Sequence, residues 1–554
     1  MADRCVFTDS SRKIAEQFLQ TIVVVDDRAF LGEEIHPHSR LKKPGRGASL
    51  SREKKEVAEP EERGTDAHGL DAKEFVDRFA EKGLLCSIIK PESASEELGP
   101  KMIAVSRRAD IVVLDWVIDK IRGDKALELI KQITQDDAIK DNNNRLRLLV
   151  VYTGENELIE IADKIEAELK TIHSPVRVDD FTLQWGTSRV AVYAKEGVSV
   201  PGHLKTRIIS IHKLPDALVN EFAATTMGLL SNFALAGLTA IRENTHRIIT
   251  KFPPKLDAPY LAHRALLDPP EEAEAHVLPI FVSELESVLK DTRVASHISI
   301  AEIEKWIGCR TMSPVDLCRR MKIRSRKGAV DAMVAVIRDG IRAERVSSSY
   351  PGWSKILSPL KNESDKKCLS NLTNILTLDG RPGTEFDREL ALLMSVNSRY
   401  SSPPPSLTLG TIVAEDVETR TSYYVCIQPA CDSVRLSEDN RAFPFLRFKI
   451  ASKSSADDFG YIVKDRDSVV ELRLKIRPYE VQQVFFKPRT GSKEIQAVKK
   501  DSDWIFTSKE PKERHFRWIA DLKQAHAQRV ANEFANQISR VGLTESEWLR
   551  RNAK

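Results

Sequence analysis

The pentapeptide Val23-Val24-Val25-Asp26-Asp27 decides the fold of the N-terminal part of the chain. Consecutive β-branched residues closed by two acids are typical of a short strand that is buried on both faces and ends at a polar position. The run alone does not separate such a strand from a buried helix segment, so the surrounding sequence has to decide.

Three further apolar runs end in the same way, on a residue that can bind a metal or a phosphate. They are Ile111-Val112-Val113-Leu114-Asp115, Leu149-Val150-Val151-Tyr152-Thr153-Gly154 and Val190-Ala191-Val192-Tyr193-Ala194-Lys195. Amphipathic segments at 72–82 and 124–133 lie between them, so strands and helices alternate. This alternation predicts an α/β, doubly wound parallel sheet over residues 1–214.

In such a sheet the residues that follow the strands share one crevice at the carboxyl edge. We therefore expect five residues to meet there: Asp26, Asp27, Asp115, Thr153 and Lys195. Crowded carboxylates favour a hard divalent cation with oxygen ligands, most simply Mg²⁺. One carboxylate can then attack a phosphoryl group, while the lysine and the metal neutralise the phosphoryl oxygens.

These residues and their order resemble the receiver domains of bacterial response regulators, over about residues 18–215. The resemblance implies that Asp26 and Asp27 hold Mg²⁺ together with Asp115, which is the phosphoacceptor. It also implies that Thr153 is the switch hydroxyl and Lys195 the phosphate-pairing lysine. Gly123-Asp124, followed by Ala126 to Ile130, resembles the start of the family's third helix. The partner implied is a histidine kinase, and the setting resembles bacterial anti-phage relays of the Detocs type.

The chain departs from the family pattern near the lysine and after the first acids. Glu196 replaces the proline that usually follows the lysine, and the proline expected soon after the acceptor is absent. The position of the family's switch aromatic, three residues before the lysine, is occupied by Val192, and Tyr193 follows one residue later. We therefore expect Tyr193 to point to the other face of its strand. Residues 33–69 are polar and charged, which predicts a disordered insertion beside the acidic pair, either a solvated loop or a docking segment.

Composition places the chain among soluble multidomain proteins. The 85 basic and 81 acidic residues give a net charge of only +4, which does not predict nucleic-acid binding. Seven scattered cysteines favour a reducing compartment over a disulfide framework. We find no signal-peptide pattern and no run of apolar residues long enough to span a membrane, so a cytoplasmic protein is expected.

The remainder predicts an α-helical domain at 215–400 and a β-rich domain at 401–554 with C-terminal helices. Strands are expected at 422–427, 445–450, 469–476 and 481–486, and helix from Glu510 to Arg551. His246 and His263 are helical histidines, most simply structural, and Cys426 with Cys431 lacks the second ligand pair that structural zinc requires.

The leading hypothesis is a non-enzymatic phosphorelay protein that acts as a phosphate sink or as a switch for a protein contact, with a downstream effector or a second copy as possible partners. One alternative is an effector that binds nucleic acid through its β domain under control of phosphorylation. Another is a receiver-like scaffold that is not phosphorylated at all. No motif downstream of residue 215 identifies a catalytic domain.

Overall fold

The structure is a computed structural model. It describes residues 6–30, 70–91, 98–141, 145–268, 270, 272–309, 326–340, 372–377, 382–400, 403–437, 439–450, 459–539 and 550. The contacts divide the chain into two compact units, Met1–Thr311 and Met312–Lys554. The insertion predicted at 33–69 lies outside the described residues, but Phe30 and Asp71 on either side of it form a β-bridge. The two ends of the insertion are therefore held together.

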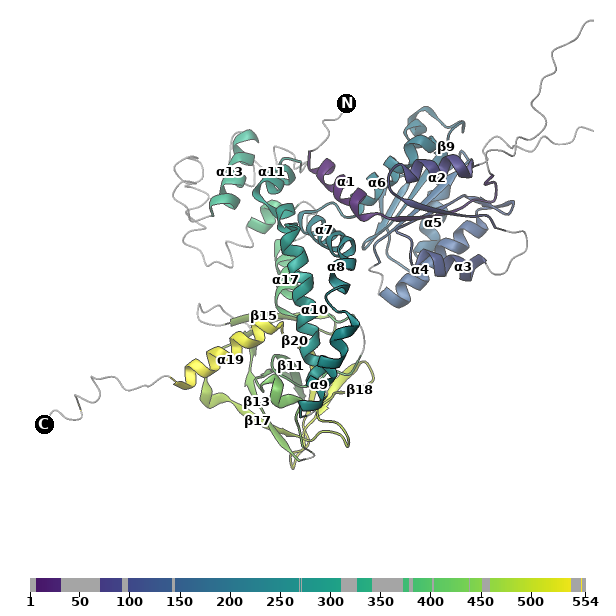
Figure 1. The fold of residues 1–554 in the computed structure, drawn as a ribbon. Helices are drawn as coiled ribbons and strands as arrows, with labels where there is room; N and C mark the ends of the chain where they lie inside the picture. Colours follow the sequence, from purple (N-terminus) through teal and green to yellow (C-terminus); the bar gives the residue numbers. More distant parts are fainter. Residues whose placement is uncertain are drawn as a thin grey trace, which may run out of the picture. The chain divides into compact units, whose positions relative to one another are not determined.

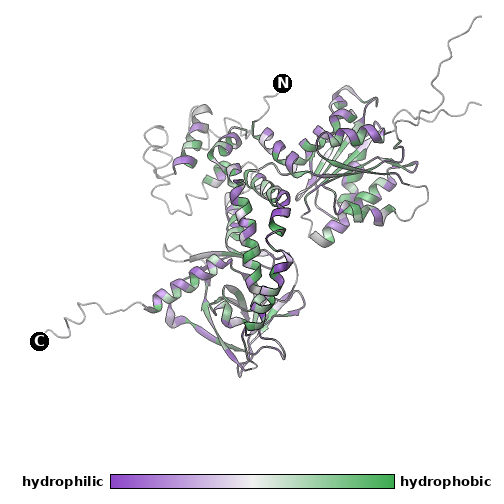
Figure 2. Ribbon diagram, viewed as in Figure 1, coloured by the Kyte–Doolittle hydropathy of each residue, from purple (hydrophilic) through white to green (hydrophobic). Residues whose placement is uncertain are grey.

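The first unit is built on the predicted parallel sheet (Figure 1). Its strands are β1 (Thr21–Val25), β2 (Leu85–Ile89), β3 (Ile111–Leu114), β6 (Arg147–Thr153) and β9 (Ser188–Lys195), in the order β2-β1-β3-β6-β9. An antiparallel hairpin of β7 (Val176–Asp179) and β8 (Thr182–Trp185) extends the edge beside β9, and β10 (Ile208–Ile209) also pairs with β9. The hairpin and β10 were not predicted. Figure 2 shows hydrophobic residues along the strands of this sheet, as burial on both faces requires.

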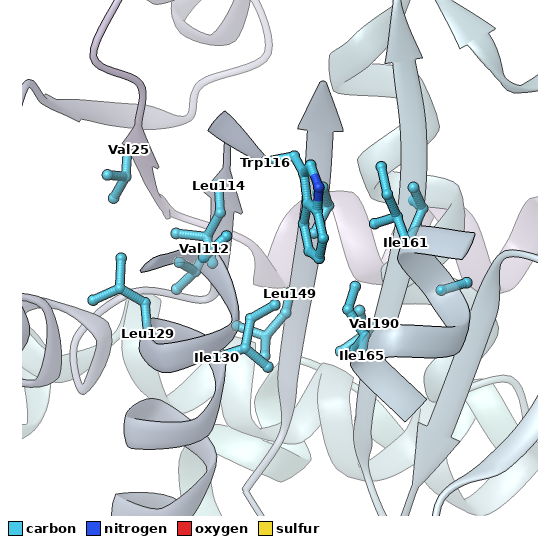
Figure 3. Close-up of a cluster of buried hydrophobic side chains, with 14 of the residues drawn as sticks. Val25, Val112, Leu114, Trp116, Leu129, Ile130, Leu149, Ile161, Ile165 and Val190 are labelled. Carbon is cyan, nitrogen blue, oxygen red and sulfur yellow. The ribbon is translucent and has the colours of Figure 1, made fainter. Parts of the chain in front are cut away.

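Helices cover both faces of the sheet. One face packs on α3 (Leu98–Ser106), α4 (Asp124–Asp141) and α5 (Leu158–Leu169), and Figure 3 shows the aliphatic side chains and Trp116 that fill this core. The other face packs on α1 (Val6–Phe18), α2 (Ala72–Ala80), α6 (Leu214–Thr225) and α7 (Leu229–Glu243).

Helix α6 belongs to the core of the α/β unit. Its residues Leu214, Leu218 and Phe222 are fully buried among the side chains of the sheet. The domain boundary proposed at residue 214 therefore falls inside the first compact unit.

The described elements from α6 to residue 395 are helical, which confirms the predicted helical region. The first unit continues with α8 (Thr245–Ile249), α9 (Asp257–Leu266), α10 (Glu272–Asp291) and α11 (Ile300–Cys309). The second unit includes α13 (Arg326–Asp339) and α17 (Gly383–Ser395). In the described part of the chain no single helix is long and apolar enough to cross a membrane, although α6 and α7 pass that test jointly as a pair bent by 119°.

The second unit is the predicted β-rich domain. Its seven-stranded antiparallel sheet has the order β17-β13-β12-β11-β20-β19-β18, and a second sheet has the order β14-β16-β15. The strands are β11 (Thr411–Val417), β12 (Arg420–Cys426), β13 (Arg441–Arg447), β14 (Lys449–Ile450), β15 (Phe459–Asp465), β16 (Ser468–Leu474), β17 (Gln482–Phe486), β18 (Val498–Lys500), β19 (Asp503–Thr507) and β20 (His515–Asp521). All four predicted strand segments are confirmed.

The helix predicted from Glu510 to Arg551 is wrong over its first part. His515–Asp521 is strand β20, which lies between β11 and β19, and the helix α19 begins only at Gln524 and ends at Ser539. Phe516 and Ala520 are buried, and the strand is paired along both of its edges. This pairing comes from tertiary contacts, which the local pattern of charges does not reveal.

Of the cysteines, Cys86, Cys426 and Cys431 are free, whereas Cys309 is disulfide-bonded, which its spacing did not predict.

Candidate functional site

The parallel registers bring the predicted site residues to one edge of the sheet. Val25 pairs with Leu114, Leu114 pairs with Val151, and Thr153 pairs with Ala194. The residues that follow β1 and β3, together with the ends of β6 and β9, therefore occupy adjacent positions on four neighbouring strands. This is the crevice in which open α/β sheets carry their functional groups.

Lys195 is the centre of the site. Its Nζ donates to Asp26 Oδ2 and to Asp115 Oδ2, each at 2.7 Å. The three side chains are almost completely buried, with side-chain exposures of 7% for the lysine and 3% for each acid. Two buried carboxylates thus share one buried ammonium group.

The pKa shifts follow from this arrangement. Burial raises the pKa of Asp26, Lys195 opposes that rise, and the nearby Asp115 adds to it. Burial works against the charge of Lys195, but attraction to Asp115 and Asp26 outweighs it, so the pKa of the lysine is raised. The lysine is therefore held firmly in its charged form.

The second acid of the first pair, Asp27, contacts a short hairpin that follows Asp115. Strands β4 (Val117–Ile118) and β5 (Ile121–Arg122) are joined by Asp119 and Lys120, which both have positive φ, 56° and 60°. The backbone N–H groups of these two residues donate to Asp27 Oδ2 at 2.7 and 3.4 Å. At the other end of the hairpin, Arg122 forms ion pairs with Glu155 and Glu157, which follow Thr153.

The hairpin is fixed at its base by Trp116 and Gly123. Gly123 has φ +85°, its N–H donates to the carbonyl of Trp116, and a Cβ at this position would lie 2.6 Å from the indole ring. Only glycine fits this contact without a shift of the tryptophan. The hairpin therefore connects Asp27, Asp115 and the loop after β6.

Thr153 and Tyr152 close β6 on opposite faces. The Thr153 hydroxyl is fully buried and accepts a hydrogen bond from the N–H of Glu155 at 3.1 Å. The Lys195 ammonium lies 5.8 Å from the centre of the Tyr152 ring, and the Tyr152 hydroxyl donates to the carbonyl of Ile209.

Tyr193 lies on the face that packs on α6, whereas Val192 belongs to the opposite core, as expected from the one-residue shift. The Tyr193 hydroxyl donates to Glu221 Oε1 at 2.5 Å, and Glu221 also pairs with Arg189. Burial, with Glu221 beside it, raises the pKa of Tyr193. The tyrosine is therefore a neutral donor that connects β9 to α6.

The carboxylates were expected to hold a metal. Within the described ranges, no three histidine, cysteine or acidic residues are arranged to hold one, because Lys195 lies between two of the acids. The donor set nevertheless suits Mg²⁺ in chemistry, and one observation favours a cation there: Asp27 Oδ1 is buried and has no hydrogen-bond partner.

The other residues considered from the sequence lie elsewhere. His246 is exposed on α8, and His263 on α9 contacts only His276 through its ring, at 3.2 Å. Cys426 is completely buried, which raises the pKa of its thiol to about 12, so it is not a nucleophile near neutral pH. The hairpin and its contacts were missed, since two-residue strands without a glycine or asparagine turn leave no clear signal.

Comparison with known proteins identifies the N-terminal domain. Residues 18–200 match the family model described as a response receiver domain. The N-terminal domain of this chain is therefore a receiver domain of the response-regulator type. No curated protein and no solved structure matches the chain significantly.

Proposed function

We propose that the chain is a phosphorelay protein and that Asp115 accepts a phosphoryl group from the phosphohistidine of a histidine kinase. The observation that carries the proposal is the buried Lys195, held at 2.7 Å from Asp115 and from Asp26 at the carboxyl edge of the receiver sheet. The buried lysine contacts two acids, and Asp27 adds a third carboxylate beside them, a donor set that suits a hard divalent cation at a phosphoryl-transfer site.

The two oxygens of Asp115 differ in their surroundings. Oδ2 accepts from Lys195, whereas Oδ1 accepts a long hydrogen bond from the N–H of Val117, at 3.3 Å. We infer that Oδ1 attacks the phosphorus atom. The P–N bond of the donor breaks, its electron pair stays on the imidazole nitrogen, and that nitrogen takes up a proton.

After the transfer, Lys195 is in place to pair with the phosphoryl oxygens, and the N–H of Val117 can donate to them. Asp26, Asp27 and Asp115 are the residues that would hold Mg²⁺, and the ion would neutralise charge on the transferred group. The hydroxyl of Thr153, which now contacts its own loop, is the proposed donor to the new phosphate.

We propose a phosphate sink or a protein-contact switch as the output. Two contacts support the switch: Tyr152 on β6 contacts Ile209, in the segment that leads into α6, and Tyr193 on β9 contacts Glu221 within α6. A partner effector or a second copy would bind the helices differently after the change.

For the cellular setting we propose an anti-phage relay, which a plaque assay comparing wild type with Asp115→Asn would test.

The decisive experiment is labelling of the full chain with acetyl phosphate or phosphoramidate in Mg²⁺, read by intact mass and peptide mapping. The wild type should gain one phosphoryl group on Asp115, and Asp115→Asn should gain none. Asp180→Asn, an exposed acid outside the site, is the matched control and should label normally. Normal labelling of Asp115→Asn would overturn the site, and an unlabelled wild type would favour the scaffold reading.

A further inference from the structure

We propose that a groove in the second unit binds a nucleoside phosphate, either free or as one unit of a single strand of nucleic acid. The groove has a volume of about 680 Å³, which falls in the range of small-ligand sites. It belongs to the β-rich domain and is independent of the phosphoacceptor at Asp115.

The groove forms where two strands part. Strand β13 pairs with β17 only from Arg441 to Phe445, and beyond this point it pairs with β12 alone. The short helix η6 (Pro478–Glu480) leads into β17 on the opposite side. The cavity is lined by the diverging end of β13 on one side and by residues 479–482 on the other.

One wall of the groove carries positive charge. Arg447 at the end of β13 and Lys449 at the start of β14 are both exposed, and both line the groove on either side of the buried Phe448. Arg447 donates to the Ser422 hydroxyl at 2.9 Å, and within the described residues Lys449 has no hydrogen-bond or ion-pair partner. Glu480, which also lines the groove, is paired with Arg477 at 2.8 Å, so its charge is already matched by a cation other than Arg447 and Lys449.

The opposite wall offers an aromatic surface. The Tyr479 side chain on η6 is 80% exposed, an unusual state for an aromatic residue in a folded domain. The ring is therefore available for stacking with a flat base. The hydroxyl groups of Thr421 and Ser422 line the same groove and can bond to a sugar or a base edge.

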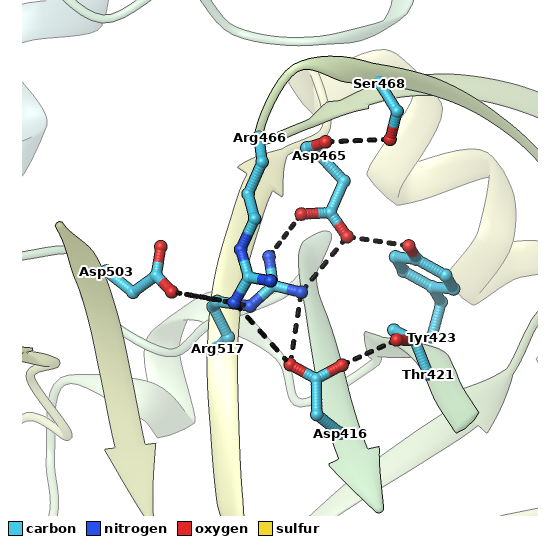
Figure 4. Close-up of polar contacts among 8 residues, drawn as sticks. All are labelled: Asp416, Thr421, Tyr423, Asp465, Arg466, Ser468, Asp503 and Arg517. Carbon is cyan, nitrogen blue, oxygen red and sulfur yellow. Dashed lines mark hydrogen bonds and ion pairs between the residues drawn. The ribbon is translucent and has the colours of Figure 1, made fainter. Parts of the chain in front are cut away.

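Two residues that line the groove, Thr421 and Tyr423, belong to the network of polar contacts in Figure 4. The Tyr423 hydroxyl donates to Asp465 Oδ2 at 2.7 Å, and Arg517, itself buried, pairs with the same carboxylate. Thr421 Oγ1 donates to Asp416 at 2.6 Å, and Asp416 also pairs with Arg517. Thr421 and Tyr423 are thereby held in place on β12 before any ligand arrives.

Paired cations beside an exposed aromatic ring are the features by which proteins bind nucleotides: charge for the phosphate and stacking for the base. An acidic peptide would use the cations but not the exposed ring. A purely apolar ligand would use the ring and leave Arg447 and Lys449 facing its apolar surface. The nucleoside phosphate is the class that uses both walls.

The test measures binding to the full chain of AMP and UMP by calorimetry, and of fluorescently labelled dT and rU twelve-mers by anisotropy at several salt concentrations. The test variants are Lys449→Ala and Tyr479→Ala. Lys500→Ala and Tyr400→Ala, an exposed lysine on β18 and a tyrosine that is 97% exposed outside the groove, are the matched controls. Thermal unfolding of each variant verifies that the domain remains folded.

We expect Tyr479→Ala to weaken binding roughly 5- to 150-fold, the range for loss of one stacked base. Lys449→Ala should weaken binding and lower the salt slope for a single strand by about 0.7. If the wild type binds mononucleotides and the two test variants do not, the groove is a site for free nucleotides. If the wild type binds only the twelve-mers, the groove is a site for a single strand. No binding by any probe, or equal losses in the control variants, would overturn the proposal.

Discussion

Lys195→Ala should lower the free energy of unfolding of the first unit by about 3–5 kcal/mol at pH 7.5, because removal of one partner from a buried ion pair leaves the other charge uncompensated. Here the loss affects two acids at once. Asp26 and Asp115 each have a side chain only 3% exposed and each lie 2.7 Å from the lysine, so neither can turn readily to water for compensation.

The defect should depend on pH in a defined direction. The raised pKa of Lys195 means that its contribution is complete below its unfolded value, 10.5, and is lost as the pH rises through the folded value. The raised pKa of Asp26 has the same sense: folding favours its protonated form, and stability is lost as the pH rises from 3.8 through the folded value. Without the lysine that pKa should rise further, so acidification from pH 7.5 to about 5 should restore part of the stability of Lys195→Ala.

Urea unfolding followed by tryptophan fluorescence, to which the buried Trp116 and Trp185 of this unit contribute, would measure the effect. The double variant Asp26→Asn/Lys195→Ala removes one of the two stranded charges, so it should be more stable than Lys195→Ala alone at pH 7.5. A Lys195→Ala protein within about 0.5 kcal/mol of wild type at pH 7.5 would refute the reasoning, since that is the range of ordinary surface substitutions.

Three other substitutions test the surroundings of the site. Gly123→Ala should cost about 2–4 kcal/mol in urea unfolding, because a Cβ would lie 2.6 Å from the Trp116 ring at a positive φ. Lys120→Gly should stabilise the unit by about 0.5–1 kcal/mol, since glycine adopts a φ of 60° without strain and keeps the N–H that contacts Asp27. Excess Mg²⁺, at about 100 times its dissociation constant, should add about 2.7 kcal/mol to wild type in thermal unfolding and far less to Asp27→Asn, and equal gains would remove Asp27 from the metal site.

The sequence was sufficient for the receiver sheet because its information is local. Each apolar run is short, rich in β-branched residues and followed by a residue with a chemical role. The same few residues therefore indicate the strand, its burial and the position of a site residue. The doubly wound sheet order, β2-β1-β3-β6-β9, then makes these strand ends neighbours. The convergence of Asp26, Asp115 and Lys195 follows from topology alone, before any side chain is placed.

Other features depend on contacts that a single sequence does not reveal. The turn at Asp119 and Lys120 adopts positive φ without glycine or asparagine, because Asp27 accepts its N–H groups from a distant part of the chain. The segment His515–Asp521 is charged at intervals and resembles a helix, yet pairing along both edges makes it a strand. In both cases a tertiary partner overrides the local preference.

The position of Lys195 limits how the receiver can switch. One ammonium group now serves two carboxylates, and a phosphoryl group on Asp115 would bring additional negative charge to the same ion. Lys195 would then move toward the phosphate and away from Asp26, whose carboxylate would need another cation, and three acids with an orphaned Asp27 oxygen are the donors that Mg²⁺ prefers. The ring of Tyr152 lies beside the lysine and its hydroxyl is bonded to Ile209, so a shift of the lysine would reach the segment that leads into α6. Metal binding, phosphorylation and the position of that helix should therefore be thermodynamically linked, and each should alter the apparent affinity or population of the others.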